Sequence, residues 1–483
     1  MTPVGLRRQA VSGASWTAVA TLFGASVQIL QVAVLARFLR PEDFGLMALV
    51  TVVIGLAQTY ADAGTSGAIV HRQQASTEHL SSLFWLNVLV GIAMALIVVA
   101  LAPVVAGFYA EPRLTHLLWV CALAFLVTPV GNQMQMRFQR DLQFGVLAGI
   151  DALATVAGAS VAVALAISGQ GVWSLVWGFL ASGFARSATL LWLGLRDWAP
   201  QWRLQREDLR GYLRFGAFQI GERTVNYLSA NLDKLLIGSL LGAHALGLYS
   251  VTYQLVMKPL RVVAPVFNRV AFPLFAKVQK DPARLKSGFL DGIGAVAFVL
   301  FPAYAGAIVL AEPLVMVVLG EQWRMVIPVL QVLSALAFFY SLGNPLGSLL
   351  LATGRVEIGF YLNVWRLALF TIAITVGAHW NLLGVAAALL VATVVGMFPL
   401  GFFVRWFLVS MRPVEYLRAF LPMLLCALAM ATIVWAARHS GLVAGHGPLF
   451  ELVTLSALGI ALYAGAVAYW LRGFLGRLRG ARA

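Results

Sequence analysis

Ionisable side chains lie at helical spacing inside long apolar segments of this chain. Within residues 215–241, four polar residues are separated by four, three and four positions, so they share one face of a helix. They are Glu222, Asn226, Ser229 and Asp233. Arg223 and Lys234 directly follow two of them. Because charge inside an apolar helix is costly, such groups usually face a bundle interior or a water-filled cavity, and they are candidates for binding.

Two further apolar segments carry polar faces of the same kind. Residues 245–276 hold basic and amide side chains within a narrow sector of a helix, and residues 44–68 hold an acid among neutral polar groups. The first set is Lys258, Arg261, Asn268 and Arg269, and the second is Gln58, Asp62 and Thr65. Together the three faces predict a hydrated cavity, although each charge taken singly could equally belong to a structural ion pair.

Basic groups outnumber acidic groups inside the apolar segments. The basic residues are Arg186, Arg223, Lys234, Lys258, Arg261, Arg269 and Arg366, and the acids are Asp62, Asp151, Glu222 and Asp233. This surplus predicts an anionic ligand such as a diphosphate, which Arg binds bidentately and Lys binds as a point charge. Asp62, Glu222 and Asp233 are candidates for coupling a proton or a cation, with structural pairing as the alternative. Arg186 and Arg366 are predicted instead to lie near helix ends and to extend to the membrane interface.

The composition is that of a membrane protein. Apolar residues make up 61% of the 483 residues and charged residues 11%, against about half and about a quarter in soluble domains. A helix that crosses a bilayer needs roughly 20 apolar residues, and runs of that length recur along the chain. We therefore predict an all-α polytopic fold with about fourteen transmembrane helices. The predicted spans are 12–36, 44–68, 80–106, 114–135, 144–167, 172–195, 215–241, 245–276, 287–310, 325–351, 358–377, 382–407, 417–437 and 449–471.

Positive charge is unevenly distributed between the predicted connections. The connection 196–214 contains five Arg, whereas 168–171 and 242–244 contain no Lys or Arg. Since Lys and Arg collect on the cytoplasmic side of membrane spans, both termini are predicted to be cytoplasmic. The net charge of +15 therefore requires no nucleic-acid partner, and no basic, aromatic-interleaved soluble module is present to bind one.

Short motifs recur in the same order along the chain. The repeated pairs are Phe44-Gly45-Leu46 with Leu246-Gly247-Leu248, Ala122–Phe125 with Ala335–Phe338, Gly131-Asn132 with Gly343-Asn344, and Gly171-Val172 with Gly384-Val385. Each copy would hold six spans, an even number, so both copies would enter the membrane in the same direction. We predict two parallel six-helix lobes, residues 1–200 and 201–411, with a substrate path between them. Residues 412–483 would add two further helices and a basic tail.

Five short stretches, with Pro259, carry a family resemblance. They are Leu35–Leu46, Asp62–Gly64, Ala68–Arg72, Asn231–Gly238 and Leu246–Ser250. With these stretches the chain resembles the polysaccharide transporter family, the Wzx-type flippases of lipid-linked oligosaccharides. The resemblance is closest to the colanic-acid and teichuronic-acid exporter branch of the multidrug, oligosaccharidyl-lipid and polysaccharide exporter superfamily.

The resemblance implies a function as well as a fold. It implies alternating access and, as substrate, an oligosaccharide linked to undecaprenyl diphosphate. The substrate would pass from the cytoplasmic to the periplasmic leaflet of a bacterial inner membrane, alongside glycosyltransferases and a glycan polymerase, for exopolysaccharide, capsule or lipopolysaccharide biosynthesis. Asp62, Asp233 and Lys234 lie in the family motifs. The full set predicted to line the cavity is Asp62, Arg223, Asn226, Asp233, Lys234, Lys258, Arg261 and Arg269.

Other functions are weighed against this one. A lipid II flippase would bind the same diphosphate, and the two additional helices resemble those of such flippases, so this alternative stays open. A multidrug exporter of the same superfamily would move cations, which the surplus of basic groups disfavours. A membrane-bound glycan polymerase or ligase is disfavoured because the seven His residues are scattered. The chain has no glycine-rich phosphate loop ending in Lys-Ser/Thr, so we predict a transporter without enzyme activity, metal or cofactor.

Overall fold

The computed structural model describes residues 3–61, 77–141, 143–202, 205, 212–403, 411–440 and 446–480. Helix is the only regular secondary structure within these ranges, which confirms the predicted all-α class. The chain divides into two compact units, residues 1–250 and residues 251–483. The predicted lobe boundaries follow sequence repeats rather than contacts, and they stay predictions.

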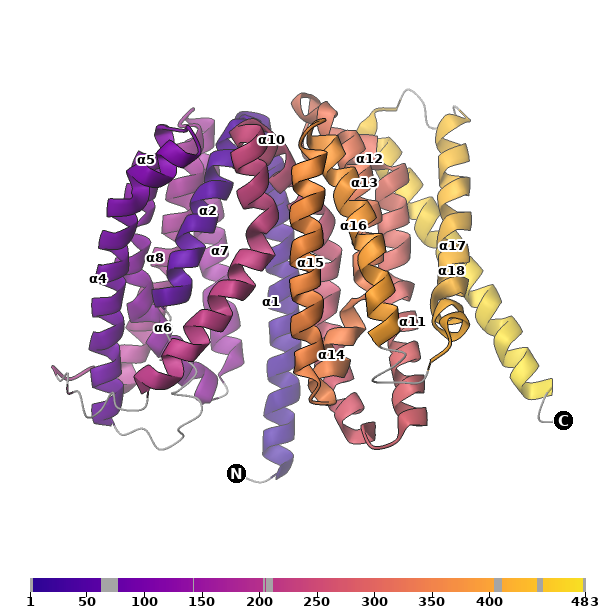
Figure 1. Cartoon of the computed structure of the whole chain (residues 1–483), viewed down its shortest axis with the longest axis horizontal. Helices are drawn as coiled ribbons and strands as arrows, with labels where there is room; N and C mark the ends of the chain where they lie inside the picture. Colours follow the sequence, from indigo (N-terminus) through magenta and orange to yellow (C-terminus); the bar gives the residue numbers. More distant parts are fainter. Residues whose placement is uncertain are drawn as a thin grey trace. The chain divides into compact units, whose positions relative to one another are not determined.

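Unit 1 is a bundle of long helices (Figure 1). It consists of α1 (Pro3–Phe38), α2 (Pro41–Ala61), α4 (Thr77–Phe108), α5 (Arg113–Cys121), α6 (Ala124–Arg140), α7 (Phe144–Ile167), α8 (Val172–Asp197) and the first part of α10 (Tyr212–Val278). Helix α7 packs against α1 and α8, and α6 packs against α4 and α8. The predicted spans 144–167 and 172–195 closely match α7 and α8, because Gly171, with a φ of 54°, interrupts the helix between them.

Unit 2 begins within α10 and contains the remaining helices. They are α11 (Pro282–Val309), α12 (Ala311–Val318), the 3₁₀ helix η1 (Glu321–Val326), α13 (Ile327–Leu342), α14 (Asn344–Ala352), α15 (Val356–Gly377), α16 (Leu382–Phe403), α17 (Pro413–His439) and α18 (Pro448–Gly480). Helix α11 packs against α13 and α17, and α16 packs against α13 and α15. This arrangement makes α11, α13 and α16 the helices around which unit 2 is built.

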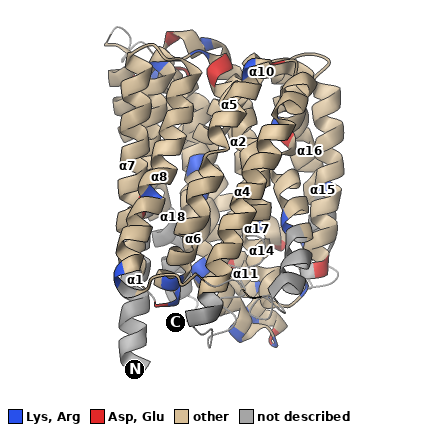
Figure 2. Cartoon of the chain, turned by 90° about the vertical axis from the view of Figure 1, so that its left-hand side faces the viewer, with Lys and Arg blue, Asp and Glu red and all other residues tan. Residues whose placement is uncertain are grey.

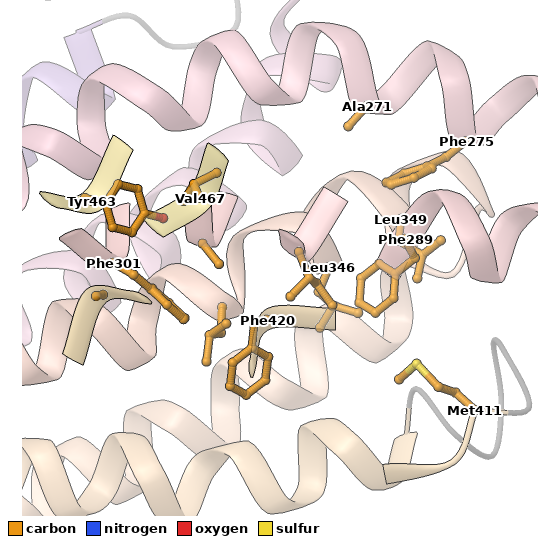
Figure 3. Close-up of a cluster of buried hydrophobic side chains, with 14 of the residues drawn as sticks. Ala271, Phe275, Phe289, Phe301, Leu346, Leu349, Met411, Phe420, Tyr463 and Val467 are labelled. Carbon is orange, nitrogen blue, oxygen red and sulfur yellow. The ribbon is translucent and has the colours of Figure 1, made fainter. Parts of the chain in front are cut away.

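Aromatic side chains hold the two C-terminal helices to the rest of unit 2 (Figure 3). Phe301 of α11 stacks on Phe338 with ring centroids 4.0 Å apart and meets Phe420 of α17 edge-on at 5.9 Å. The Tyr463 hydroxyl of α18 donates a hydrogen bond of 2.9 Å to the carbonyl oxygen of Phe298. At the other end of α17, Arg438 donates to Glu451 of α18 at 2.7 Å and to Glu312 of α12 at 2.6 Å. Helices α17 and α18 are therefore an integral part of unit 2.

Two predicted spans are not single straight helices. Span 114–135 is divided into α5 and α6 by a turn at Ala122 and Leu123. Span 325–351 is divided into η1, α13 and α14, with Gly343 between the last two helices. Both breaks leave the chain running in one general direction (Figure 1). A periodic apolar pattern survives such breaks, which is why the sequence did not predict them.

Ten helices in the described ranges are long and apolar enough to cross a membrane, and shorter apolar stretches cover Leu22–Phe38 and Leu382–Met397. One of the ten, Arg223–Val278, bends at Gly242 and is long enough for two crossings. Most Lys, Arg, Asp and Glu residues lie toward the helix ends (Figure 2). The chain is a membrane protein of many spans, and the count of fourteen stays a prediction.

Candidate functional site

Most of the predicted binding residues lie on α10. The helix bends at Gly242, where φ is 80° and ψ is 178°, a conformation that glycine adopts without steric cost. The predicted binding residues before the bend belong to unit 1, and those after the bend belong to unit 2. They are Arg223, Asn226, Asp233 and Lys234 before the bend, and Lys258, Arg261 and Arg269 after it. Asp62 and the side chain of Glu222 lie outside the described residues.

The Asp233 carboxylate joins the two sides of the bend. Its Oδ2 accepts a hydrogen bond of 2.7 Å from the hydroxyl of Tyr249, and its Oδ1 accepts one of 2.9 Å from the backbone N–H of Lys234. Tyr249 is buried, with 1% of its surface exposed. The Lys234 ammonium donates to the amide oxygen of Asn231 at 3.0 Å. Asp233 therefore fixes the geometry of α10, because both of its oxygens bind groups of the same helix.

Basic residues form a strip on the second part of α10. Arg261 and Arg269 are exposed and Lys258 is half-buried. Spacings of three and eleven residues place all three on one side of a helix. In unit 1, Asn226 is exposed and Arg223 is half-buried. The strip has the charge that an anionic ligand requires, and its contact with a ligand stays a prediction.

Helices α2 and α10 meet in unit 1 along a seam of small residues. A methyl group added to Gly45 would overlap the carbonyl oxygen of Ala243, and one added to Gly247 would overlap that of Pro41. Beside them, His244 Nδ1 lies 2.7 Å from a carboxylate oxygen of Glu42. Glu42 and His244 are 202 positions apart, which is the offset of the first repeat motif, and the two glycine contacts lie within one helical turn of that offset. Members of the first predicted repeat motif, Phe44–Leu46 and Leu246–Leu248, therefore contact each other.

Further along α2, a tyrosine of α10 extends the seam. The Tyr227 hydroxyl donates to the carbonyl oxygens of Thr51 at 3.2 Å and Val52 at 3.1 Å. A methyl group added to Gly55 would overlap the same hydroxyl. The two helices thus approach closely over several turns, because glycines lie where a larger side chain would separate them.

Unit 1 contains a pocket of about 750 Å³ between α2, α6, α7 and α8. Asn132, Trp177 and Arg186 are among its lining residues. Arg186 Nε lies 2.9 Å from Asp151 Oδ1 of α7, an ionic contact in which the N–H does not point at the oxygen. Arg186 lies near the middle of α8. The prediction that it extends from a helix end to the interface is therefore wrong.

Unit 2 contains a pocket of about 360 Å³ on the corresponding helices of the predicted repeat. It lies between the second part of α10 and helices α13 to α16, and Asn344, the repeat counterpart of Asn132, lines it. Arg366 donates to the hydroxyl of Tyr340 at 2.6 Å and to the amide oxygen of Asn363 at 3.1 Å. Arg366 lies midway along α15, so the helix-end prediction is wrong here too.

Sequence reasoning missed Tyr340 and Asn363 as partners of this arginine. A signal was present, because Arg366 lies in the centre of the apolar run 358–377 and Asn363 precedes it by one helical turn. No group of three His, Cys, Asp or Glu residues in the described ranges is placed to hold a metal ion.

A family model described as "Polysaccharide biosynthesis protein" matches residues 34–328. The chain is 34% identical to the lipopolysaccharide biosynthesis protein WzxC of Escherichia coli K12, over 78% of this chain and 76% of that protein. It is 31% identical to the teichuronic acid biosynthesis protein TuaB of Bacillus subtilis 168, over 96% of this chain and 95% of that protein. The chain belongs to the polysaccharide biosynthesis protein family. The predicted resemblance to this family is confirmed.

The fold of this polysaccharide biosynthesis protein is also found in a solved transporter. The lipid II flippase MurJ, in an inward closed conformation, aligns with a TM-score of 0.78 at 14% identity, over 95% of this chain and 99% of that chain. This likeness confirms the predicted fold class. The family model ends at residue 328, in the first turn of α13, so nearly all of the helices α13 to α16 that line the unit 2 pocket lies beyond it.

Proposed function

We propose that this chain moves an oligosaccharide linked to undecaprenyl diphosphate from the cytoplasmic to the periplasmic leaflet of a bacterial inner membrane. The exported glycan would enter exopolysaccharide, capsule or lipopolysaccharide biosynthesis. Membership of the polysaccharide biosynthesis protein family carries the proposal, since TuaB matches over 95% of its own length. The fold shared with a flippase supports transport rather than catalysis as the activity.

The basic strip on α10 is the part of the site that we assign to the diphosphate. Arg261 and Arg269 are exposed on one side of the helix with Lys258, and guanidinium groups bind phosphate oxygens through paired hydrogen bonds. The sugar would occupy the polar cavity while the polyprenyl chain stays in the lipid. Asp233 acts in this scheme as a positioning residue, because its carboxylate is occupied by Tyr249 and Lys234.

The seam between α2 and α10 is the part that we assign to alternating access. With both termini in the cytoplasm, Pro41 and Gly242 lie at the periplasmic ends of their helices, so the seam would close the periplasmic side. The contact between Gly45 and Gly247 would then separate and reform in each transport cycle. Small residues suit such a contact because they give close packing without interlocked side chains.

Export in cells tests the assignment of the basic strip. In a strain that lacks this chain, lipid-linked glycan should accumulate on the cytoplasmic side, and the wild-type gene should reverse the accumulation. Lys258→Ala, Arg261→Ala and Arg269→Ala should each reduce the reversal by about tenfold, as expected for the loss of one charge-assisted hydrogen bond. Lys277→Ala is the matched control, since Lys277 is an exposed basic residue in the last turn of the same helix.

Two results would contradict this assignment. Unchanged export in all three variants at normal protein levels would remove the basic strip from the site. Accumulation of the peptidoglycan precursor in the deletion strain, in place of a polysaccharide precursor, would replace the proposed substrate with lipid II.

A further inference from the structure

Arg366 in the unit 2 pocket is a membrane-embedded cation whose described partners are neutral. It donates to Tyr340 and Asn363, and its guanidinium lies 5.7 Å from the centre of the Tyr340 ring. Within the described residues, no carboxylate forms an ion pair with it, whereas Arg186 of unit 1 has Asp151. A guanidinium offers five N–H donors, and the hydrogen bonds to Tyr340 and Asn363 occupy two of them.

Arg366 lies deep within an apolar helix, where a charge without a counter-charge is energetically costly. Arg366 lies about 15 Å along α15 from Val356 at 1.5 Å per residue, which is about half the thickness of a hydrocarbon core of roughly 30 Å. Arg366 is therefore at least ten residues from either end of α15. Charged residues held at such positions usually serve a ligand or an ion pathway.

A second polar group in the pocket lacks a hydrogen-bond partner altogether among the described residues. The Nδ2 atom of Asn344 is buried without a hydrogen bond to any described residue. Buried donors are nearly always satisfied, so an orphaned one indicates a missing acceptor. Asn344 and Arg366 line the same pocket. Together with the Tyr340 hydroxyl, which still has its own proton to donate, they make a set of hydrogen-bond donors that suits an oxyanion.

Apart from Asn363 and Thr393, the rest of the pocket lining is apolar. Leu346, Leu350, Leu362, Leu369 and Phe370 line it beside the donors. Trp365 of the lining and Tyr361 beside it on α15 are exposed, as side chains in contact with lipid would be. A ligand that fits must therefore combine an anionic head with a hydrocarbon chain.

We propose that the unit 2 pocket binds the phosphoryl group of a lipid, held by Arg366, Tyr340 and Asn344. Two lipids have this chemistry. One is the polyprenyl-linked substrate, and in that case the site rests on the proposed function and gives it a second phosphate position at mid-membrane depth. The other is an anionic phospholipid of the surrounding membrane, and in that case the site is independent of the transported glycan.

Native mass spectrometry of the purified full-length chain tests the proposal. The probes are undecaprenyl phosphate, phosphatidylglycerol and the uncharged undecaprenol. Arg366→Met should weaken binding of at least one of the two phosphorylated lipids by about tenfold or more, the loss of a charge-assisted hydrogen bond, and leave undecaprenol binding unchanged. The matched control is the double variant D151N/R186Q. It removes the mid-helix arginine of the unit 1 pocket together with the acid that pairs with it. This variant should bind all three lipids like the wild type.

The outcomes of this experiment distinguish binding of either lipid from binding of neither. A selective loss for undecaprenyl phosphate identifies the substrate as the ligand, even if the identity of its glycan is later revised. A selective loss for phosphatidylglycerol identifies a membrane lipid. Equal binding by Arg366→Met and the wild type for both phosphorylated lipids overturns the proposal.

A second variant keeps the test independent of the folding of Arg366→Met. Asn344→Leu removes the orphaned amide and leaves the charge in place, so it should fold and should weaken the same lipid about threefold to tenfold. Unchanged lipid binding by a folded Asn344→Leu protein would contradict the proposed role of this amide.

Discussion

The pocket of unit 1 and the pocket of unit 2 lie on helices that correspond in the predicted repeat. The arginine of each pocket has a different kind of partner. Arg186 pairs with Asp151 across α7 and α8, whereas Arg366 contacts the neutral side chains of Tyr340 and Asn363. Both arginines lie near the middle of their helices. The first pocket therefore carries a neutralised charge and the second carries a net positive charge among its described residues.

The predicted repeat places the two pockets at equivalent positions, and this difference indicates that they have different tasks. An ion pair within one unit contributes to packing, since each charge lowers the cost of the other in a medium of low polarity. A cation without an acid contributes little to stability and attracts an anion instead. We infer that the unit 1 pocket is structural and that the unit 2 pocket is the binding member of the pair.

Removing the acid of unit 1 should give the largest effect on stability. Asp151→Asn leaves Arg186 without its counter-charge near the middle of α8, a predicted span, and an unpaired Arg at the centre of a membrane helix costs about 3 kcal/mol. Because both side chains are about half exposed in the isolated chain, we expect a loss nearer ~2 kcal/mol. Thermal unfolding in detergent measures it. Arg366→Met, by comparison, should leave the melting temperature unchanged or raise it.

The double variant D151N/R186Q provides the control for this difference. It removes both charges together, so it should recover most of the stability that Asp151→Asn loses. A double variant that is as unstable as the single variant would show that Asp151 acts through some other contact, and the contrast between the two pockets would then lose its electrostatic basis.

Converting the unit 2 pocket to the charge pattern of unit 1 should give a smaller effect of opposite sign. Asn363→Asp places a carboxylate at the position of the amide oxygen that now lies 3.1 Å from Arg366. The new ion pair should stabilise the chain by about 1 kcal/mol and reduce binding of phosphorylated lipids, because Arg366 is then neutralised. Melting temperature and native mass spectrometry measure the two results. Unchanged lipid binding in a stabilised Asn363→Asp protein would separate Arg366 from the ligand.

The sequence predicted one helix of each pocket closely. Span 144–167 matches α7, and span 358–377 matches α15 to within two residues, because apolar runs bounded by glycine and charge define membrane helices. Sequence order also predicted the correspondence of Gly131-Asn132 with Gly343-Asn344, and each asparagine lines the pocket of its own unit. Apolar runs therefore predicted these two helices, and the repeat that relates the two units stays a prediction.

The contacts of the charged residues could not be predicted in the same way. Asp151 and Arg186 lie on different helices, and their meeting depends on how α7 and α8 are rotated against each other, which no local pattern specifies. The same holds for Asp233, whose partner Tyr249 lies beyond the bend at Gly242. The seam at Gly45 and Gly247 is a further case, since the repeat predicted equivalent motifs and gave no indication that they touch.

The two equivalent asparagines give the finest test of the comparison. Asn132 is engaged in an interaction within the structure, whereas the Nδ2 atom of Asn344 is buried without a partner among the described residues. Replacing each by Leu removes the same amide from corresponding pockets, so Asn132→Leu should cost about 1 kcal/mol and Asn344→Leu should be neutral or slightly stabilising. Unfolding midpoints measured side by side in the same detergent give the difference directly. Equal losses of stability in the two variants would mean that the Asn344 amide is engaged within the protein, like that of Asn132. The unit 2 pocket would then have one hydrogen-bond donor fewer for its lipid.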